Sequence, residues 1–118
     1  MLKGDLYNLE VLSREGQACS AELSLIPESR IYAAHFPGMP ITPGVCILQM
    51  CVEVASEAVG RHLELSEAKD IRFLVPLKPE SDTRVRIDFS LPEGEDLPTG
   101  FVVSVGETTH AKLKLILQ

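Results

Sequence analysis

Hydrophobic and polar residues alternate with a short period at the start of this chain. Two runs rich in β-forming residues occupy positions 6–12 and 17–26, and Ser-Arg-Glu-Gly separates them. Gly16 supplies the backbone freedom that a tight turn requires, and Pro27 cannot continue a ladder of strand hydrogen bonds. The pattern therefore predicts a β-hairpin that ends near Pro27.

The pattern changes completely after residue 27. Residues 27–43 show no regular period, and we expect an irregular segment over an edge of the core. The side chains expected to pack there are Ser29, Ile31, Tyr32 and Phe36. From Val45 to Val59 apolar residues then cover nearly every face, which is typical of a buried helix.

Capping residues set the limits of this helix. Thr42 is the expected N-cap, and Pro43 suits the first turn, where a missing N–H costs nothing. Gly60 and Arg61 mark the end. The sequence thus predicts one long helix over about residues 43–60.

Four more strands are predicted after the helix. They are KDIRFLVPL (69–77), TRVRIDFSL (83–91), GFVVSVG (100–106) and THAKLKLIL (109–117). The alternation is clean from Arg84 to Phe89 and from Ala111 to Leu117, which favours antiparallel pairing. Two strands, one buried helix and four strands indicate a single α+β domain over residues 1–118, in which a curved antiparallel sheet wraps the helix.

Charge narrows the classes of partner. The net charge is −6 with no basic stripe, which argues against nucleic acid, because phosphate binding needs clustered Lys and Arg. An acidic carrier protein can still dock on a local patch such as Lys69, Arg72 and Lys78. The alternative is that these three are ordinary surface residues. At 118 residues, a chain that buries a wholly apolar helix favours a partner subunit, and we expect a homodimer or a higher homo-oligomer.

Cysteine usage and the chain start indicate a cytoplasmic protein. Cys19, Cys46 and Cys51 are odd in number and lack CxxC spacing, so we expect reduced, mostly buried thiols. The start MLKGDLYNLEVL has no long apolar run behind a basic leader. No stretch reaches the about 18 apolar residues that a membrane span needs. We therefore expect no membrane association.

Candidate chemistry lies in the run HFPGMPITPG, residues 35–44. Its prolines and glycines make a stiff, specifically shaped loop that holds His35 beside the start of the helix, which suits a general base. The alternative is an ordinary hydrogen-bonded turn residue. Gln49 and Glu53 follow on one face of the helix, about 6 Å apart along its axis. His62 and His110 stand outside this region and are expected to be structural.

The segment HFPGMPITPGVCILQM closely resembles the signature HFPGxPxxPGVLxxE of the β-hydroxyacyl-acyl-carrier-protein dehydratases, which belong to the hotdog-fold superfamily. The later segments AKDIRFLVPLKPESDTRVRIDF and AKLKLIL also resemble that family, so the likeness covers most of residues 25–118. It implies a hotdog dimer whose active sites join a loop His of one chain to a helix carboxylate of the other. The implied reaction eliminates water from a 3-hydroxyacyl thioester of acyl carrier protein or coenzyme A, giving a trans-2-enoyl thioester without metal or organic cofactor.

The resemblance assigns roles to individual residues. His35 matches the base that removes the α-proton, and the Gly44 N–H matches the donor to the thioester oxygen. Phe36, Pro43 and Val45 are the neighbouring positions expected to bind substrate. These assignments agree with the physics of a helix N-terminus, whose unpaired N–H groups and dipole stabilise an oxyanion.

The chain departs from the family at the acid. Gln49 stands where the family has Glu or Asp, and Glu53 stands where the family usually has Gln. An amide cannot deliver a proton near neutral pH, so the catalytic position at the hydroxyl falls to Gln49 or, through substrate or a water, to Glu53. A buried Glu53 needs a partner or a raised pKa. Three functions therefore stay open: a dehydratase, a catalytically silent acyl-thioester-binding protein, and a thioesterase in which Glu53 activates water.

Overall fold

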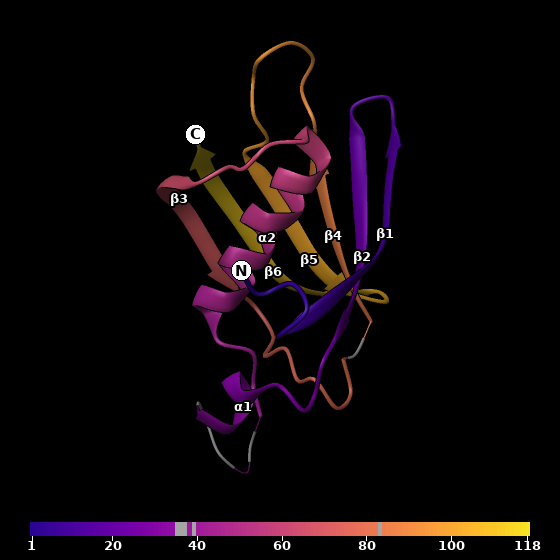
Figure 1. Cartoon of the computed structure of the whole chain (residues 1–118), viewed down its shortest axis with the longest axis vertical. Coiled ribbons are helices and arrows are strands. Elements are labelled where there is room, and N and C mark those ends of the chain that lie inside the picture. Colours follow the sequence, from indigo (N-terminus) through magenta and orange to yellow (C-terminus); the bar gives the residue numbers. More distant parts are fainter. Residues whose placement is uncertain (35–37, 39, 83) are drawn as a thin grey trace.

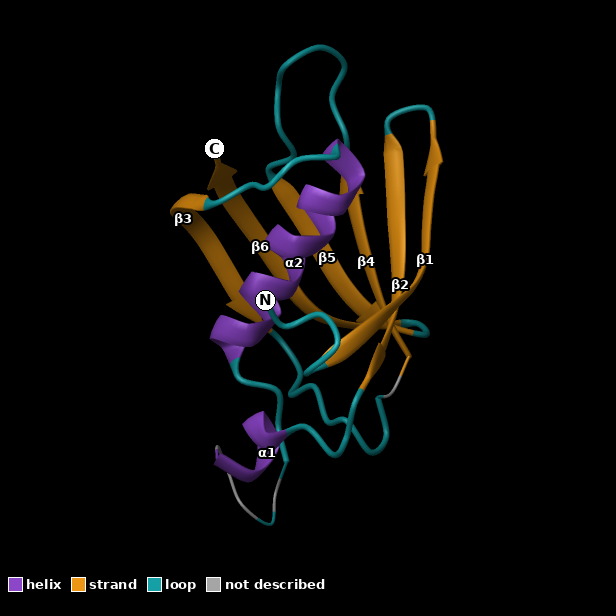
Figure 2. Ribbon diagram, in the orientation of Figure 1, coloured by secondary structure: helices purple, strands orange, loops and turns teal. Residues whose placement is uncertain are grey.

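The computed structural model describes residues 1–34, 38, 40–82 and 84–118 (Figure 1). Six strands form one antiparallel sheet in the order β1-β2-β4-β5-β6-β3. The strands are β1 (Tyr7–Glu15), β2 (Ala18–Leu25), β3 (Leu65–Phe73), β4 (Arg84–Ser90), β5 (Gly100–Val105) and β6 (Thr108–Leu117). The long helix α2 (Gly44–Val59) lies across one face of the sheet, so the predicted α+β architecture is confirmed (Figure 2).

Period-two alternation explains which sheet face packs on the helix. In β4, Val85, Ile87 and Phe89 are buried, whereas Arg84 and Arg86 are exposed. The same alternation continues along β6. The sheet therefore presents an apolar face to α2 and a polar face to solvent.

The helix is buried over most of its circumference, as its composition predicts. Its buried residues are Cys46, Ile47, Met50, Cys51, Val52, Glu53, Val54 and Ala55. At its end Gly60 adopts a left-handed conformation with φ 84° and donates its N–H to the Ser56 carbonyl at 2.9 Å. A left-handed C-terminal glycine is a common helix stop, so the predicted end is confirmed.

The helix start differs from the prediction. Pro43 is the N-cap, with φ −59° and ψ 144°, and the helix begins at Gly44. Thr42 is not the cap: its side chain is buried and shares a 2.9 Å hydrogen bond with the Tyr32 hydroxyl. A tertiary contact has thus taken the hydroxyl that local capping chemistry would use.

The segment over residues 27–43 also contains structure that the prediction missed. A short helix, α1 (Arg30–Ala34), precedes the loop. Ser29 and Tyr32 are buried, as predicted for this segment, whereas Phe36 lies outside the described residues. Propensity does not reveal so short a helix, because its single turn depends on packing rather than on its own sequence.

β3 lies at an edge of the sheet and begins earlier than predicted. It covers Leu65–Phe73 rather than residues 69–77. Its pairing with β6 shifts register twice, between Leu65 and Glu67 and between Ala68 and Asp70. Each such irregularity breaks the period-two pattern, which hides the first half of the strand from sequence reading.

All three cysteines are free and buried, as expected. Among the described residues, no helix is long and apolar enough to cross a membrane.

Candidate active site

The N-terminus of α2 carries backbone amides without an acceptor among the described residues. The Pro43 carbonyl accepts hydrogen bonds from the Cys46 and Ile47 amides, at 2.9 and 3.1 Å. Within the part of the chain that the structure describes, no acceptor meets the amides of Gly44 and Val45. Two N–H groups at the positive end of the helix dipole are therefore available to an electronegative ligand atom.

An apolar hollow of about 560 Å³ lies beside these amides. Its walls are residues 41–45 with Ile47 on one side and residues 73–77 on the other. The Thr42 amide donates to the Leu77 carbonyl at 2.8 Å and ties the two walls together. The polar end of the helix thus opens into an apolar recess, which is the usual composition of a small-molecule site.

Phe73 lies against Gly44 inside this hollow. A Cβ built on Gly44 would stand 2.6 Å from both Cε2 and Cζ of the Phe73 ring. Contacts that short do not occur between carbon atoms, so the ring occupies the place of a side chain at position 44. Any larger residue at position 44 would therefore have to displace the Phe73 ring.

His35, the expected base, lies outside the described residues, as do Phe36 and Met39. The segments that flank this loop are fixed, because the buried Tyr32 hydroxyl and Thr42 Oγ1 are 2.9 Å apart. Burial raises the pKa of Tyr32, and the hydrogen bond with Thr42 opposes that shift only in part. A neutral tyrosine thus joins the chain before the loop to the chain after it.

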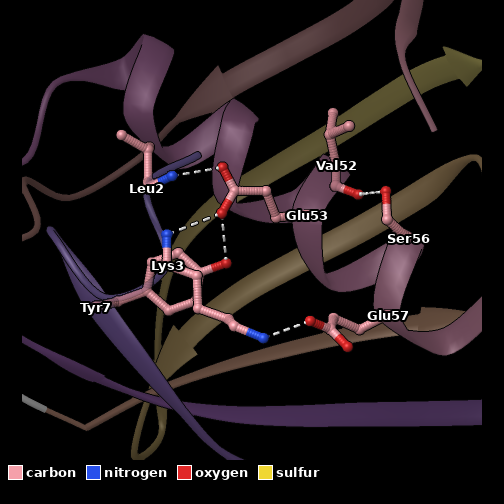
Figure 3. A network of polar contacts seen from close by, with 7 residues as sticks. All are labelled: Leu2, Lys3, Tyr7, Val52, Glu53, Ser56 and Glu57. Atoms are coloured by element: carbon pink, nitrogen blue, oxygen red, sulfur yellow. Dashed lines mark hydrogen bonds and ion pairs between the residues drawn. The ribbon is translucent and has the colours of Figure 1, made fainter. Parts of the chain in front are cut away.

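Glu53 is the most heavily hydrogen-bonded side chain of the helix, and Figure 3 shows three of its four donors. Its Oε2 accepts from the Leu2 amide at 2.8 Å and from Gln49 Nε2 at 3.0 Å. Its Oε1 accepts from the Lys3 amide at 3.0 Å and from the Tyr7 hydroxyl at 2.9 Å. A carboxylate offers about four acceptor positions, so all of them are filled.

These contacts determine the charge of Glu53. Burial alone raises the pKa of the carboxyl, but the hydrogen bonds from Leu2, Gln49, Tyr7 and Lys3 outweigh it and hold the pKa below its usual range. The carboxylate is therefore ionised near neutral pH. The expected partner exists and comes from the chain's own N-terminal segment, whereas the alternative of a raised pKa is wrong.

Tyr7 is the complementary half of this contact. It is buried, and burial together with the hydrogen bond to Glu53 raises its pKa. It therefore remains a neutral donor. One turn further along α2, Lys3 Nζ also forms an ion pair with Glu57 (Figure 3). The N-terminal segment is thus fastened to the middle of the helix by both its backbone and its side chains.

Gln49 stands between the two regions of the helix. It is exposed, shares a face with the exposed Val45 one turn earlier, and donates to Glu53 one turn later. It also borders a second hollow of about 420 Å³, which Lys3, Glu53 and the segment 60–63 line as well. Of the predicted pair, only Gln49 keeps free polar capacity.

The buried cysteines and two cations of the suggested docking patch have structural surroundings that leave them little reactivity. Burial raises the pKa of the Cys46 and Cys51 thiols, which keeps both in the unreactive protonated form. Lys69 pairs with Glu67 and Arg72 pairs with Asp70, so two cations of the suggested docking patch are neutralised locally.

Sequence reasoning missed Phe73 and Tyr7 as contributors to these two regions. Phe73 fell in the middle of the strand predicted over residues 69–77, but nothing local connected it with Gly44. Tyr7 stands 46 positions before Glu53 in the chain. The one available signal was an ionisable residue in an apolar helix, which demands a partner without naming it.

Comparison with known proteins identifies the family of this fold. The family model described as ApeI-like, ApeI dehydratase, matches residues 11–112. The 3-hydroxyacyl-(acyl-carrier-protein) dehydratase FabZ of Chlamydia trachomatis is 36% identical over 69 residues, covering 51% of this chain and 45% of that protein. The corresponding FabZ of a Caulobacter species is 26% identical over 90 residues, covering 69% of this chain and 55% of that protein. The chain thus spans about half the length of the curated relatives it matches.

Solved structures agree in fold. The dehydratase heterocomplex ApeI:P from Xenorhabdus doucetiae superposes with a TM-score of 0.77 at 20% identity, covering 94% of this chain and 96% of that one. An uncharacterised protein from Erwinia carotovora subsp. atroseptica gives a TM-score of 0.69 at 22% identity, with 96% of both chains covered. The sheet and its helix have the hotdog architecture, as the resemblance implied. Because the family model covers most of the chain, this protein belongs to the ApeI-like dehydratase family.

Proposed function

We propose that this chain eliminates water from 3-hydroxyacyl thioesters, carried on acyl carrier protein or coenzyme A, to give trans-2-enoyl thioesters. The observation that carries this proposal is the pair of amides, Gly44 and Val45, that no described residue accepts, beside an apolar hollow at the start of a buried helix. A thioester oxygen that accepts from these amides gains stabilisation as the enolate forms, because the donors are already oriented.

His35 is the proposed base. It takes the proton from C2 of the substrate, and the C2 electron pair forms the double bond as the C3–O bond breaks. The departing hydroxyl needs one proton to become water. Because Glu53 is ionised and its acceptor positions are filled, we assign that proton to the His35 imidazolium, the group that has just acquired one.

Gln49 is the proposed binding group for the hydroxyl. It lies about 6 Å along the axis from Val45 and on the same face, as a group beyond the thioester carbonyl must. Its bond to Glu53 uses one amide hydrogen and leaves the oxygen and the second hydrogen for substrate. Glu53 then acts as a positioning residue that orients Gln49, without touching the substrate.

A hydration assay tests this function. Purified protein is expected to add water to a crotonyl thioester, the reverse of elimination, and His35→Ala should lower the rate about 10²- to 10⁴-fold. His62→Ala is the matched control, because His62 is exposed and interacts with Glu64 outside the site. Absence of hydration by the unaltered protein contradicts a dehydratase.

A catalytically silent acyl-thioester-binding protein is the second candidate. The filled acceptor positions of Glu53 favour it, because they leave Gln49 without a carboxylic acid beside it. In that case thioesters bind with an affinity that His35→Ala does not change, and Gln49→Glu creates hydration activity where the unaltered protein has none. Turnover that disappears in His35→Ala rules this candidate out.

The same contacts weigh against a thioesterase. A carboxylate that activates water must accept a hydrogen bond from it, and every acceptor position of Glu53 already has a donor. Incubation with an acyl-coenzyme A should therefore release no free thiol. Thiol release that Glu53→Gln abolishes would establish the thioesterase instead.

We also propose that a second copy of the chain pairs along β3. This edge strand hydrogen-bonds to β6 on one side, and its residues are exposed along nearly their whole length. Leu74 and Val75 add exposed apolar surface just beyond its end. An uncovered edge of this kind is a template for strand addition. Light scattering at micromolar concentration should give twice the chain mass, and a monomer contradicts the dimer.

A further inference from the structure

We propose that Phe73 determines substrate choice at C2, so that the site accepts acyl thioesters without a branch next to the carbonyl and refuses those with one. This inference rests on the proposed function, because it assumes that the thioester oxygen lies on the amides of Gly44 and Val45.

The position of the ring is the first reason. In a helix the Cα–Cβ bond tilts toward the N-terminus, the same end from which the first amides point. The Phe73 ring fills the place of a Gly44 Cβ, so it lies on the side where those amides are open. The ring is also 52% exposed, so part of its surface is free to meet a ligand.

The second reason is that the chain around Phe73 is fixed. The His110 carbonyl accepts from the amides of Leu74 at 2.8 Å and Val75 at 3.3 Å. The His110 ring is buried, and its Nδ1 is 3.1 Å from the Val75 carbonyl oxygen. These bonds hold the end of β3 against β6, and the Thr42 amide holds Leu77 at the far end of the same wall. The backbone of this wall is therefore fixed, and a larger substrate has to displace the Phe73 ring itself.

Thioester geometry supplies the third reason. A carbonyl oxygen accepts from an amide at about 2.9 Å, and C2 and sulfur are each one bond from the carbonyl carbon. With the oxygen on the Gly44 amide, the planar thioester group thus lies beside Gly44, in contact with whatever covers its Cα. That group is the Phe73 ring. An unbranched C2 fits against a flat ring, whereas a methyl branch competes with it for space.

Two thioesters measure the effect. Hydration of crotonyl-coenzyme A and of 2-methylcrotonyl-coenzyme A is compared as a ratio of kcat/KM, in the unaltered protein and in Phe73→Ala. Comparing the ratios removes the intrinsic difference in reactivity between the two substrates. One methyl group in an apolar pocket changes kcat/KM by about 10- to 200-fold, so Phe73→Ala should shift the ratio at least about tenfold toward the branched substrate.

Phe73→Leu keeps an apolar side chain and protects the test if the alanine variant folds poorly; a shift of about threefold or more is expected, because less volume is released. Leu65→Ala is the matched control, since Leu65 is a partly exposed apolar residue at the other end of the same strand. It should leave the ratio unchanged.

Different results would contradict the proposed function and the proposed role of Phe73. If the unaltered protein neither binds nor hydrates crotonyl-coenzyme A, the proposed function is wrong and the role of Phe73 falls with it. If it hydrates crotonyl-coenzyme A but both Phe73 variants keep the original ratio, the function stands and Phe73 is not the determinant. A change in overall rate without a change in ratio also overturns the selective role, because a purely structural residue produces that result.

Discussion

The first turn of α2 has polar groups without partners, whereas the third turn has a polar side chain whose partners are complete. At Gly44 and Val45 the backbone offers two donors that no described residue accepts, beside an apolar hollow. At Glu53 a carboxylate offers acceptors, and three donors from the N-terminal segment together with the Gln49 amide fill all of them. One helix thus carries an open site and a closed structural contact about two and a half turns apart.

This difference separates binding capacity from stability. Groups without partners are available to a ligand, whereas groups whose partners are complete hold the fold together. The exchange of amide and carboxylate at positions 49 and 53 therefore has a structural consequence that the motif alone does not suggest. It moves the negative charge from the end of the helix that faces substrate to the place where the N-terminal segment is anchored.

The largest expected effect comes from removing that anchor. Glu53→Ala leaves the buried Tyr7 hydroxyl without its acceptor and frees the amides of Leu2 and Lys3, and we expect a loss of about 3 kcal/mol or more in the free energy of unfolding. Urea denaturation measures it.

Glu57→Gln provides the control for Glu53→Ala. Glu57 lies one turn further on and pairs with Lys3 at a half-exposed site, so its loss should cost less than about 0.5 kcal/mol. Equal losses for the two variants would mean that the segment is held by charge in general, with no special part for the buried carboxylate.

A smaller effect isolates one donor. Tyr7→Phe removes the hydroxyl that Glu53 accepts while keeping the buried ring, and it should cost about 1 to 2 kcal/mol. The double variant Tyr7→Phe with Glu53→Gln, measured by urea denaturation, should lose less than the sum of the two single losses, because the residues share one contact. Strict additivity would contradict a direct interaction.

At the N-terminal end of the helix, Gly44→Ala should lower the free energy of unfolding by about 1 kcal/mol, because the added Cβ displaces the Phe73 ring. The loss stays small because the ring is half-exposed and can turn aside. In a Phe73→Ala background the thermal midpoint should not fall when Gly44→Ala is added. If it falls equally in both backgrounds, the glycine is needed for a reason other than the ring.

The two regions also differ in how far the sequence reveals them. The helix follows from a long apolar run that ends at Gly60, the strand core follows from the period of two, and the loop motif locates the start of the helix. The contact at Glu53 does not follow, because Leu2, Lys3 and Tyr7 lie 46 to 51 positions away and carry no pattern that points to the helix.

The N-terminal end of α2 also contains a contact that the sequence does not reveal. Gly44 was identified from the motif, whereas the ring that covers it comes from Phe73 at the end of an edge strand. Register shifts in β3 conceal where that strand begins, so its far end cannot be positioned by counting residues. Periodicity predicts elements, but pairing between distant elements decides which side chains meet.

The smallest predicted effect is a dependence of stability on acid. The pKa of Glu53 is lower in the folded protein than in the unfolded chain, where a glutamate has a pKa of about 4.3. Below that pH the unfolded chain binds a proton at this glutamate while the folded protein keeps it ionised, so protonation favours unfolding. The stabilisation that the Glu53 carboxylate provides is therefore complete above about pH 4.3 and is lost as the pH falls through the folded pKa. Tyr7→Phe removes one of the bonds that lower the pKa, so urea midpoints measured between pH 6 and pH 3 should fall less steeply in this variant than in the unaltered protein. Parallel curves would show that the hydroxyl holds the N-terminal segment in place without stabilising the charge of Glu53.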